Sequence, residues 1–374
     1  MNSKKILIVT YGFYPVQSPR SFRATELAIE LARQGHEVTI LGPDRAGIDD
    51  FLSEHKLRYI SYGDIHWKIP KWPGNGRISL LINRAMVRGL SLLMEYPSLQ
   101  LMFLLKKILK ELSGFDALIS IAVPYPLHWG VASTWQKDST KNPAKVWIAD
   151  CGDPYFGREN DTFKVPFYFA WIEKWFMKKA DYITVPTETA IKGYFAEFHH
   201  KIKVIPQGFR FKEYNGKRSV PEDVVHFVYG GGFIQGRRDP RELIRFLNEQ
   251  CNTLKFRFDI YTTTPHLADI HIGPGVSIFV HSPVQREEFL EIASGADFVV
   301  NFNNIGTVQT PSKLIDYAIL NKPILNITTG NLDKYNVLKF LNRDFSQNYI
   351  ISDAQQYRIE NVAKKFLDLV DTKI

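Results

Sequence analysis

Two stretches of the sequence combine residue types that could bind phosphate groups. In the first, an apolar run is followed by Gly231 and Gly232 and then by Arg237 and Arg238. Glycines let a backbone approach an anion without a Cβ in the way, and arginines offer planar donors that match phosphate oxygens. A tight turn with exposed arginines would have the same composition. We expect a diphosphate as the ligand of this stretch.

The second stretch predicts the start of a helix. Thr310 can cap it and Pro311 suits its first position, which leaves the amides of Ser312 and Lys313 at the positive end of the helix dipole. A lysine in the first turn opposes the dipole, which favours an anion bound beside it. Asp316 falls on the same face and could accept hydrogen bonds from a ribose diol. The alternative is an ordinary polar surface.

Two further candidates lie in the first half of the chain. His128 in PYPLHWG and Asp153 in IADCGDPYFG follow the ends of two expected strands, so both should lie at the carboxyl edge of a sheet. Asp153 could accept a hydrogen bond from an attacking hydroxyl, and His128 could orient it. The structural alternatives are a core histidine and a turn cap.

The elements that must position these residues alternate along the chain. Short β-branched runs alternate with helical periodicity, which predicts doubly wound α/β domains with parallel sheets. One helix is marked by Ser18 as N-cap, Pro19 at its first position and Gly35 beyond its end. We expect a first domain over 1–205, a linker over 206–223, a second domain over 224–350, and a C-terminal helix within 351–374 that packs back on the first domain. A ligand should bind in a cleft between the two domains.

Length and composition agree with two domains. The 374 residues exceed what one core usually serves, and 45% of them are hydrophobic. Cys151 and Cys251 have no partner at metal-ligand spacing, which excludes a disulfide scaffold, a zinc ribbon and a CxxC redox site. The apolar run near the start is too short for a signal peptide, and no stretch is long enough to cross a bilayer, so we expect neither a leader nor a membrane-spanning helix.

The net charge of +8 is concentrated in one segment. Residues 56–115 carry +7, mixed with tryptophans and many leucines. This mixture is typical of basic amphipathic helices at an anionic membrane, although core helices with solvated basic faces would have the same composition. Nucleic acid is not an expected partner, since no binding motif accompanies the charge.

Five segments in order resemble a family of known fold. The segments are KKILIVTYGFYPVQSPRSFRATELAIELARQGHEVTIL, IADCGDPYFG, ADYITVPTETAIKGYF with KIKVIPQGF, the glycine and arginine stretch, and TPSKLIDYAILNKPILNI. Together they resemble GT-B glycosyltransferases of family four, over nearly the whole chain. The resemblance implies two Rossmann-like domains, a nucleotide-diphosphate sugar on the second domain, an acceptor on the first, and transfer with retention and without a metal.

The resemblance assigns roles to the candidate residues. Arg238, Lys313 and Asp153 are the expected catalytic residues. The donor is expected to contact Gly231, Gly232, Arg237, Ser312 and Asp316. Gly12 and His128 are expected on the acceptor side. The DxxD formed by Asp150 and Asp153 is not expected to bind a metal, because the fold already supplies cationic groups for the leaving diphosphate.

Two departures from the family pattern affect the donor site. Val308 stands where many members have the first Glu of an EX7E motif, and Asp316 replaces the second. Glycines stand where an arginine often follows the strand before the phosphate loop. The subgroup with a PSK signature resembles this chain better. These departures affect the expected contacts to the donor sugar and leave the expected diphosphate contacts of Arg237, Arg238 and Lys313 in place.

The sequence thus predicts a retaining glycosyltransferase that needs no cofactor beyond its donor substrate. The expected acceptor is a hydroxyl of a lipid-linked bacterial surface glycan. The expected location is cytoplasmic, peripheral on the inner face of the plasma membrane. A nucleotide-sugar 2-epimerase and a catalytically silent binding subunit of a polysaccharide-assembly complex are the alternatives.

Overall fold

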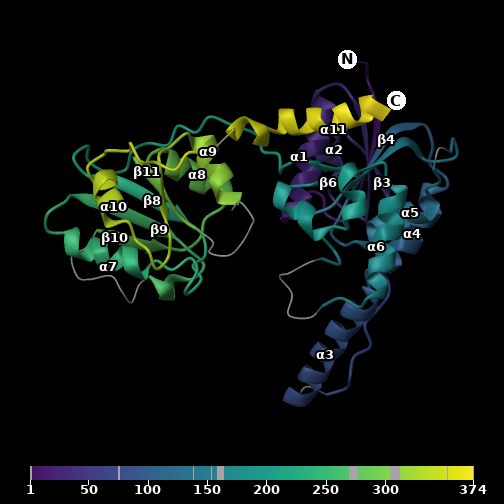
Figure 1. The fold of residues 1–374 in the computed structure, drawn as a ribbon, viewed down its shortest axis with the longest axis horizontal. Coiled ribbons are helices and arrows are strands. Elements are labelled where there is room, and N and C mark those ends of the chain that lie inside the picture. Colours follow the sequence, from purple (N-terminus) through teal and green to yellow (C-terminus); the bar gives the residue numbers. More distant parts are fainter. Residues whose placement is uncertain are drawn as a thin grey trace. The chain divides into compact units, whose positions relative to one another are not determined.

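The chain folds into two compact units, each built on one parallel sheet (Figure 1). The computed structural model describes residues 2–74, 76–137, 139–152, 154–157, 164–268, 277–303, 312–351 and 353–373. The first unit comprises residues 1–210 and 356–374, and the second comprises 211–355. The chain therefore enters the second unit within the stretch expected to be a linker, and it returns to the first unit near its end.

The first unit contains a seven-stranded sheet in the order β3-β2-β1-β4-β5-β6-β7, and every pairing is parallel. Its strands are β1 (Lys5–Thr10), β2 (Glu37–Gly42), β3 (Arg58–Ser61), β4 (Phe115–Ile121), β5 (Ala144–Asp150), β6 (Tyr182–Val185) and β7 (Ile202–Val204). Its helices are α1 (Pro19–Arg33), α2 (Asp49–Glu54), α3 (Arg77–Met94), α4 (Gln100–Leu109), α5 (Pro126–Thr134), α6 (Tyr168–Lys179) and α11 (Ile359–Lys373). Short 3-10 helices occupy Glu188–Gly193, Ala196–Lys201 and Ala354–Tyr357.

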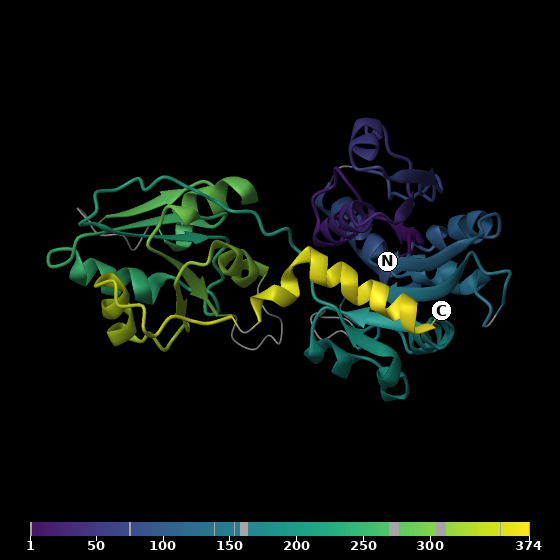
Figure 2. The same ribbon diagram turned by 90° about the horizontal axis from the view of Figure 1, so that it is seen from above.

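Helices cover both faces of this sheet. One core joins α1, α2 and α11 to the side chains of one strand face, and a second core joins α4, α5 and α6 to the other face (Figure 2). The C-terminal helix α11 buries Ile359, Val362, Phe366 and Val370 in the first of these cores. The last segment of the chain is therefore part of the first unit.

The second unit contains a five-stranded parallel sheet in the order β10-β9-β8-β11-β12. Its strands are β8 (Val225–Gly230), β9 (Phe256–Tyr261), β10 (Ile278–His281), β11 (Phe298–Phe302) and β12 (Ile324–Ile327). Its helices are α7 (Arg241–Gln250), α8 (Arg286–Ser294), α9 (Ser312–Leu320) and α10 (Lys334–Leu341), with a 3-10 turn at Pro265–Leu267. Helices α7 and α10 cover one face, and α8 and α9 cover the other.

The predicted fold class is confirmed. Both units are doubly wound α/β domains with parallel sheets. The cap predicted for the first helix is also present, because the Ser18 side chain accepts a hydrogen bond from the Ser21 amide and Pro19 opens α1. Gly35 takes a φ of 90° just beyond the helix end.

Candidate active site

The second sheet reverses its strand order between β8 and β11. Strand β8 pairs with β9 on one side and with β11 on the other. In doubly wound sheets, ligands bind outside the carboxyl ends of the strands at such a reversal. The stretch with Gly231, Gly232, Arg237 and Arg238 follows β8 directly, and α9 is the helix that follows β11. The two stretches with predicted phosphate chemistry therefore follow the two strands that flank the reversal.

The glycines after β8 make a turn that other residues would not adopt. Gly231 has a φ of 137°, and its amide donates to the Tyr261 carbonyl over 2.7 Å. This backbone conformation favours glycine. Gly232 passes close to the next strand end, since a Cβ added to it would lie 3.0 Å from Thr263 Oγ1. The turn brings bare backbone to the carboxyl edge of the sheet.

The two arginines follow within a closed loop. The Ile234 amide donates to the Arg238 carbonyl over 3.1 Å, and the Arg237 amide donates to the Ile234 carbonyl over 3.0 Å. The Arg237 side chain is exposed, whereas Arg238 is half-buried. Within the described part of the chain, the buried Nε of Arg238 has no hydrogen-bond acceptor. The backbone of the loop thus holds both arginines near the end of β8.

The acidic residue beside these arginines is already bound. Arg241 Nε donates to Asp239 Oδ1 over 2.8 Å, and the Gly236 amide donates to Oδ2 over 3.1 Å. The hydrogen bond from Arg241 lowers the pKa of Asp239 to about 2. Asp239 therefore stabilises the loop and balances the charge of Arg241, which leaves the positive charges of Arg237 and Arg238 available for a ligand.

The described part of α9 begins at Ser312. The side chains of Ser312 and Lys313 lie outside what the structure describes, as do Val308, Thr310 and Pro311 entirely. The predicted cap and the predicted lysine contact therefore stay predictions. The helix itself is anchored to the sheet, because the buried Tyr317 hydroxyl donates to the Val300 carbonyl of β11 over 3.0 Å.

Asp316 is paired with an arginine that the sequence analysis did not single out. Arg286 Nε, at the start of α8, donates to Asp316 Oδ1 over 2.9 Å. Burial would lower the pKa of Arg286, but the Asp316 carboxylate outweighs it and raises that pKa. A ribose at Asp316 would consequently meet a carboxylate and a guanidinium together. No spacing in the sequence signals this pair, because its members lie on separate helices.

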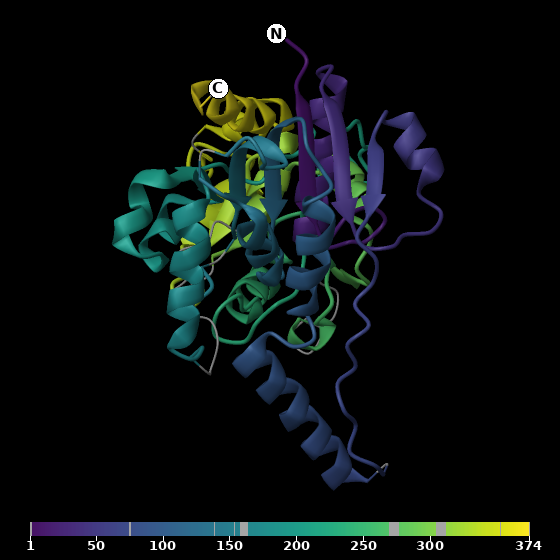
Figure 3. The same cartoon turned by 90° about the vertical axis from the view of Figure 1, so that its right-hand side faces the viewer.

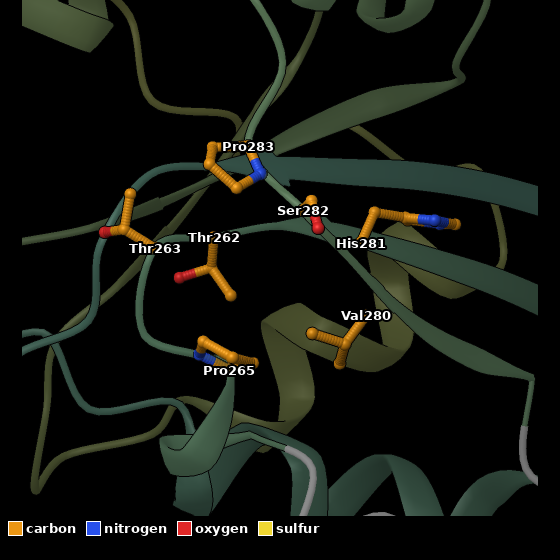
Figure 4. Close-up of a pocket in the computed structure, with 7 residues that line it drawn as sticks. All are labelled: Thr262, Thr263, Pro265, Val280, His281, Ser282 and Pro283. Atoms are coloured by element: carbon orange, nitrogen blue, oxygen red, sulfur yellow. The ribbon is translucent and has the colours of Figure 1, made fainter.

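A cavity of about 420 Å³ opens at the carboxyl ends of the neighbouring strands β9 and β10 (Figure 4). Thr262, Thr263 and Pro265 follow β9, while the rest of its lining comes from the end of β10 and the turn beyond it: Val280, His281, Ser282 and Pro283. The glycine loop is fixed to this region, since the Phe233 amide donates to Thr264 Oγ1 over 2.7 Å. The sequence analysis did not identify this cavity, which depends on loops from two strands.

In the first unit, Gly12 lies where β1 turns into α1. A Cβ at this position would lie 2.6 Å from Ser21 Oγ, so only glycine fits against the first turn of the helix. The guanidinium of Arg20, from the same turn, lies against Gly152 after β5, and a Cβ at Gly152 would overlap it. Gly12 and Gly152 therefore each let a residue of the first turn of α1 pack closely at the carboxyl edge of the first sheet. Arg20 was not among the residues expected there.

The DxxD motif is divided between a core residue and one outside the described residues. Asp153 is the latter, so its expected contact stays a prediction. Asp150 is fully buried and binds Arg23 through both oxygens at 2.6 Å, with Thr184 Oγ1 at 2.6 Å and Arg20 Nη1 at 3.3 Å. Burial opposes its charge, yet the arginines lower its pKa. Among the residues with described positions, no cluster of three or more His, Cys, Asp or Glu could hold a metal ion.

His128 lies in the core, which differs from the position expected from the sequence. Its ring is fully buried between Ser120 Oγ, 2.8 Å from Nδ1, and Cys151 Sγ, 3.5 Å from Nε2. Burial lowers the pKa of His128 to about 3, so the ring is neutral at physiological pH. The reason is the surroundings of α5, whose residues from Pro126 to Ala132 are all buried. Other buried side chains therefore separate the His128 ring from any acceptor bound at the sheet edge.

These features match one enzyme family. The sequence profile of Glycosyltransferase Family 4 matches residues 22–212, just over half of the chain. The chain belongs to glycosyltransferase family 4. No protein in the curated sequence comparison matches it significantly.

Solved structures show the same GT-B fold as expected for the family. A glycosyltransferase from Rickettsia africae has a TM-score of 0.60 at 11% identity, covering 100% of this chain and 99% of its own. The lipopolysaccharide outer core galactosyltransferase WaaB has 0.55 at 12%, covering 99% and 100%. Anabaena HepE, solved with UDP and glucose, has 0.54 at 10%, covering 99% and 100%. At these identities the likeness establishes the fold alone.

In the part of the chain that the structure describes, no helix is both long and apolar enough to cross a membrane.

Proposed function

We propose that this family 4 enzyme transfers a sugar from a nucleotide-diphosphate sugar, bound by its second unit, to a hydroxyl of a surface glycan. The observation that carries the proposal is the arrangement around the strand reversal of the second sheet. The glycine loop, two arginines and the helix α9 follow the strands that flank it, and a cavity of about 420 Å³ adjoins them. The solved structure of HepE with UDP and glucose supports a donor of this class.

The three parts of such a donor have matching surroundings. The cavity between Thr262 and Pro283 suits the base, since it has apolar walls and hydroxyl groups. The pair of Asp316 and Arg286 suits the ribose diol, because a carboxylate accepts and a guanidinium donates hydrogen bonds. The diphosphate then lies at the bare backbone of Gly231 and Gly232, within reach of the arginines of the same loop.

The chemistry assigned to this site is departure of the diphosphate. As the bond between the sugar C1 and the phosphate oxygen breaks, negative charge grows on the leaving group, and Arg237, Arg238, Lys313 and the first amides of α9 stabilise it. The acceptor oxygen bonds to C1 on the same face, and its proton passes to the leaving phosphate oxygen. The anomeric configuration is retained, and neither a carboxylate nucleophile nor a metal ion is required.

The first unit is assigned the acceptor. Gly12 and Gly152 let the first turn of α1 pack closely against the carboxyl edge of its sheet, and Arg20, which lies against Gly152, adds a positive charge there. Asp153, in the segment after β5, is assigned the contact with the attacking hydroxyl. The lipopolysaccharide galactosyltransferase among the structural neighbours supports a surface glycan as acceptor, and we extend this to a lipid-linked one at the inner face of a plasma membrane.

The proposal is tested first by donor binding. Thermal shifts with UDP, GDP, UDP-glucose and GDP-mannose should show stabilisation by one nucleotide, growing with the logarithm of its concentration. Arg238→Ala should weaken that nucleotide about 10-fold or more, while Arg245→Ala, an exposed arginine of α7, should leave the affinity unchanged. No stabilisation by any nucleotide, or equal affinity in Arg238→Ala, would contradict the donor site.

The reaction type is tested with the bound donor and extracted lipid-linked glycans. Release of nucleoside diphosphate should depend on the acceptor, and the product should keep the anomeric configuration of the donor. Conversion of the donor to its 2-epimer without an acceptor would instead establish an epimerase. Tight donor binding with no turnover under any acceptor would establish a silent binding subunit.

A further inference from the structure

Helix α3 and the segment before it project from the first unit as an arm, defined here as residues 63–96 (Figure 3). Within α3 only Ser79 is buried, and its hydroxyl donates to the Gly74 carbonyl over 2.7 Å, with the Trp72 and Pro73 carbonyls of the same segment at 3.1 and 3.2 Å. The Trp72 amide also donates to Asn83 Oδ1 over 2.7 Å. The helix is therefore held along one narrow side and open on the others.

The open sides of α3 are largely apolar. Ile78 is 76% exposed and Leu81 is 64% exposed, values that are unusual for such side chains in a folded domain. The exposed apolar residues of the helix are Ile78, Leu80, Leu81, Val87, Leu93 and Met94. So many exposed apolar side chains on one projecting helix indicate an interaction site with a protein or a membrane.

The charges of α3 are all positive and share one face. Arg77, Arg84 and Arg88 follow each other at i+7 and i+4, the spacing that returns to the same side of a helix, and all three are exposed. Leu80 and Leu81 flank this row on either side. The helix contains no Asp or Glu. The adjoining Glu95 accepts a hydrogen bond from the Tyr155 hydroxyl over 2.8 Å.

Aromatic side chains extend the apolar surface at the base of the arm. Phe167 and Trp171, at the start of α6, are 69% and 68% exposed and contact each other edge to face, with ring centroids 5.5 Å apart. The hydroxyl of their neighbour Tyr168 donates to the Leu93 carbonyl at the end of α3. The two exposed surfaces therefore adjoin. Tryptophan and other aromatic rings are favoured at the level of lipid headgroups.

We infer that α3 is a membrane-binding helix that lies in the headgroup region of an anionic bilayer. The exposed Ile78, Leu80 and Leu81 enter the acyl boundary, while the long side chains of Arg77 and Arg84 reach back to lipid phosphates. The absence of a carboxylate within α3 argues against a second copy of the helix as the partner, since two copies would bring arginines together without neutralising groups. The inference rests on the membrane location given under the proposed function and names the element that would bind the membrane; its test needs neither donor nor transfer, so the two can fail separately.

The test is sedimentation of the full chain with vesicles, at low and high salt. Vesicles of phosphatidylcholine with phosphatidylglycerol should bind the protein, and pure phosphatidylcholine should bind it at least 10-fold more weakly.

Arg77→Gln with Arg84→Gln should weaken binding about 5-fold for each charge removed. Leu80→Ser with Leu81→Ser should weaken it about 10-fold or more. All four positions are exposed, so folding should be unaffected, which circular dichroism and thermal melting check.

Matched controls use the second unit. Arg245→Gln removes an exposed arginine of α7, and Tyr335→Ser removes a side chain that is 67% exposed on α10; both should bind vesicles like the wild type. Equal binding to neutral and anionic vesicles, or unchanged binding in both α3 variants, would overturn the inference. So would a dimer in sedimentation velocity that the leucine variant dissociates, because the apolar surface would then be an interface between copies.

Discussion

The Arg23 guanidinium binds both carboxylate oxygens of Asp150, with Nε to Oδ2 and Nη2 to Oδ1 each at 2.6 Å. The same guanidinium donates to the carbonyls of Pro206, at 2.6 Å, and Ile205, at 3.0 Å. Both side chains are almost fully buried. One arginine of α1 thus links the ends of β5 and β7 at the carboxyl edge where the first unit is expected to bind its substrate.

Arg23→Leu should destabilise the first unit by about 3 to 5 kcal/mol, because it leaves the buried Asp150 carboxylate without its main partner. The measurement is the urea midpoint of the transition in which the first unit unfolds. Arg245→Leu, which removes an exposed arginine of α7, is the control and should shift the midpoint little. An Arg23→Leu protein that unfolds at the wild-type midpoint would show that the pair is not stabilising.

Glu173 of α6 should make the stability of the first unit fall as the pH rises. Its side chain is 1% exposed and accepts the Tyr155 amide over 3.1 Å, and burial raises its pKa from 4.5 to about 7. Between pH 4.5 and 7 Glu173 is protonated in the folded state and ionised in the unfolded state. Its contribution to the free energy of unfolding is therefore fully present below pH 4.5 and is lost as the pH rises through 7. The loss should amount to roughly 3 kcal/mol.

The check on Glu173 is the urea midpoint at pH 5, 6, 7 and 8 for the wild type and Glu173→Gln. The glutamine variant cannot titrate at this position, so its midpoint should vary less with pH than that of the wild type. If the urea midpoints of the two proteins changed with pH in the same way, the pH dependence would come from a residue other than Glu173.

Arg238→Ala and Lys313→Ala should each reduce transfer about 100-fold, as expected when one preorganised charge contact to a developing anion is removed. Steady-state release of nucleoside diphosphate measures the effect. Arg245→Ala serves as the matched control and should turn over normally. Normal turnover in folded Arg238→Ala and Lys313→Ala proteins would place the diphosphate site elsewhere.

Addition of EDTA should leave transfer unchanged, because the proposed site stabilises the leaving group with arginines, a lysine and helix amides. The comparison is the initial rate before and after chelation, with readdition of Mg²⁺ or Mn²⁺ as the control. Loss of activity that Mn²⁺ restores would assign a metal to the site and direct attention back to Asp153.

Local signals explain why much of the fold was predictable. The N-cap Ser18, Pro19 and Gly35 act within α1 and its ends, and each has the predicted role. The alternation of β-branched runs with helical periodicity indicated parallel sheets, because apolar β-branched runs such as those of Lys5–Thr10 and Tyr182–Val185 suit strands that are buried on both faces.

The parts that were not predictable depend on packing between distant segments. His128 precedes a tryptophan in a short apolar helix, and nothing in its neighbourhood distinguishes a core ring from a ligand-facing one. Arg20 and Arg286 acquire their significance from Gly152 and Asp316, which lie far from them in sequence. The cavity requires the ends of both β9 and β10, so no single motif encodes it.

The return of α11 to the first unit has a consequence for biosynthesis. Ile359, Val362, Phe366 and Val370 complete a core whose other members lie in the first two hundred or so residues of the chain. During translation, residues 211–355 leave the ribosome before α11 does, so the second unit can fold while the first still exposes an apolar face. The unit that is synthesised first is therefore finished last, and until then its uncovered face is a potential site for chaperone binding or aggregation.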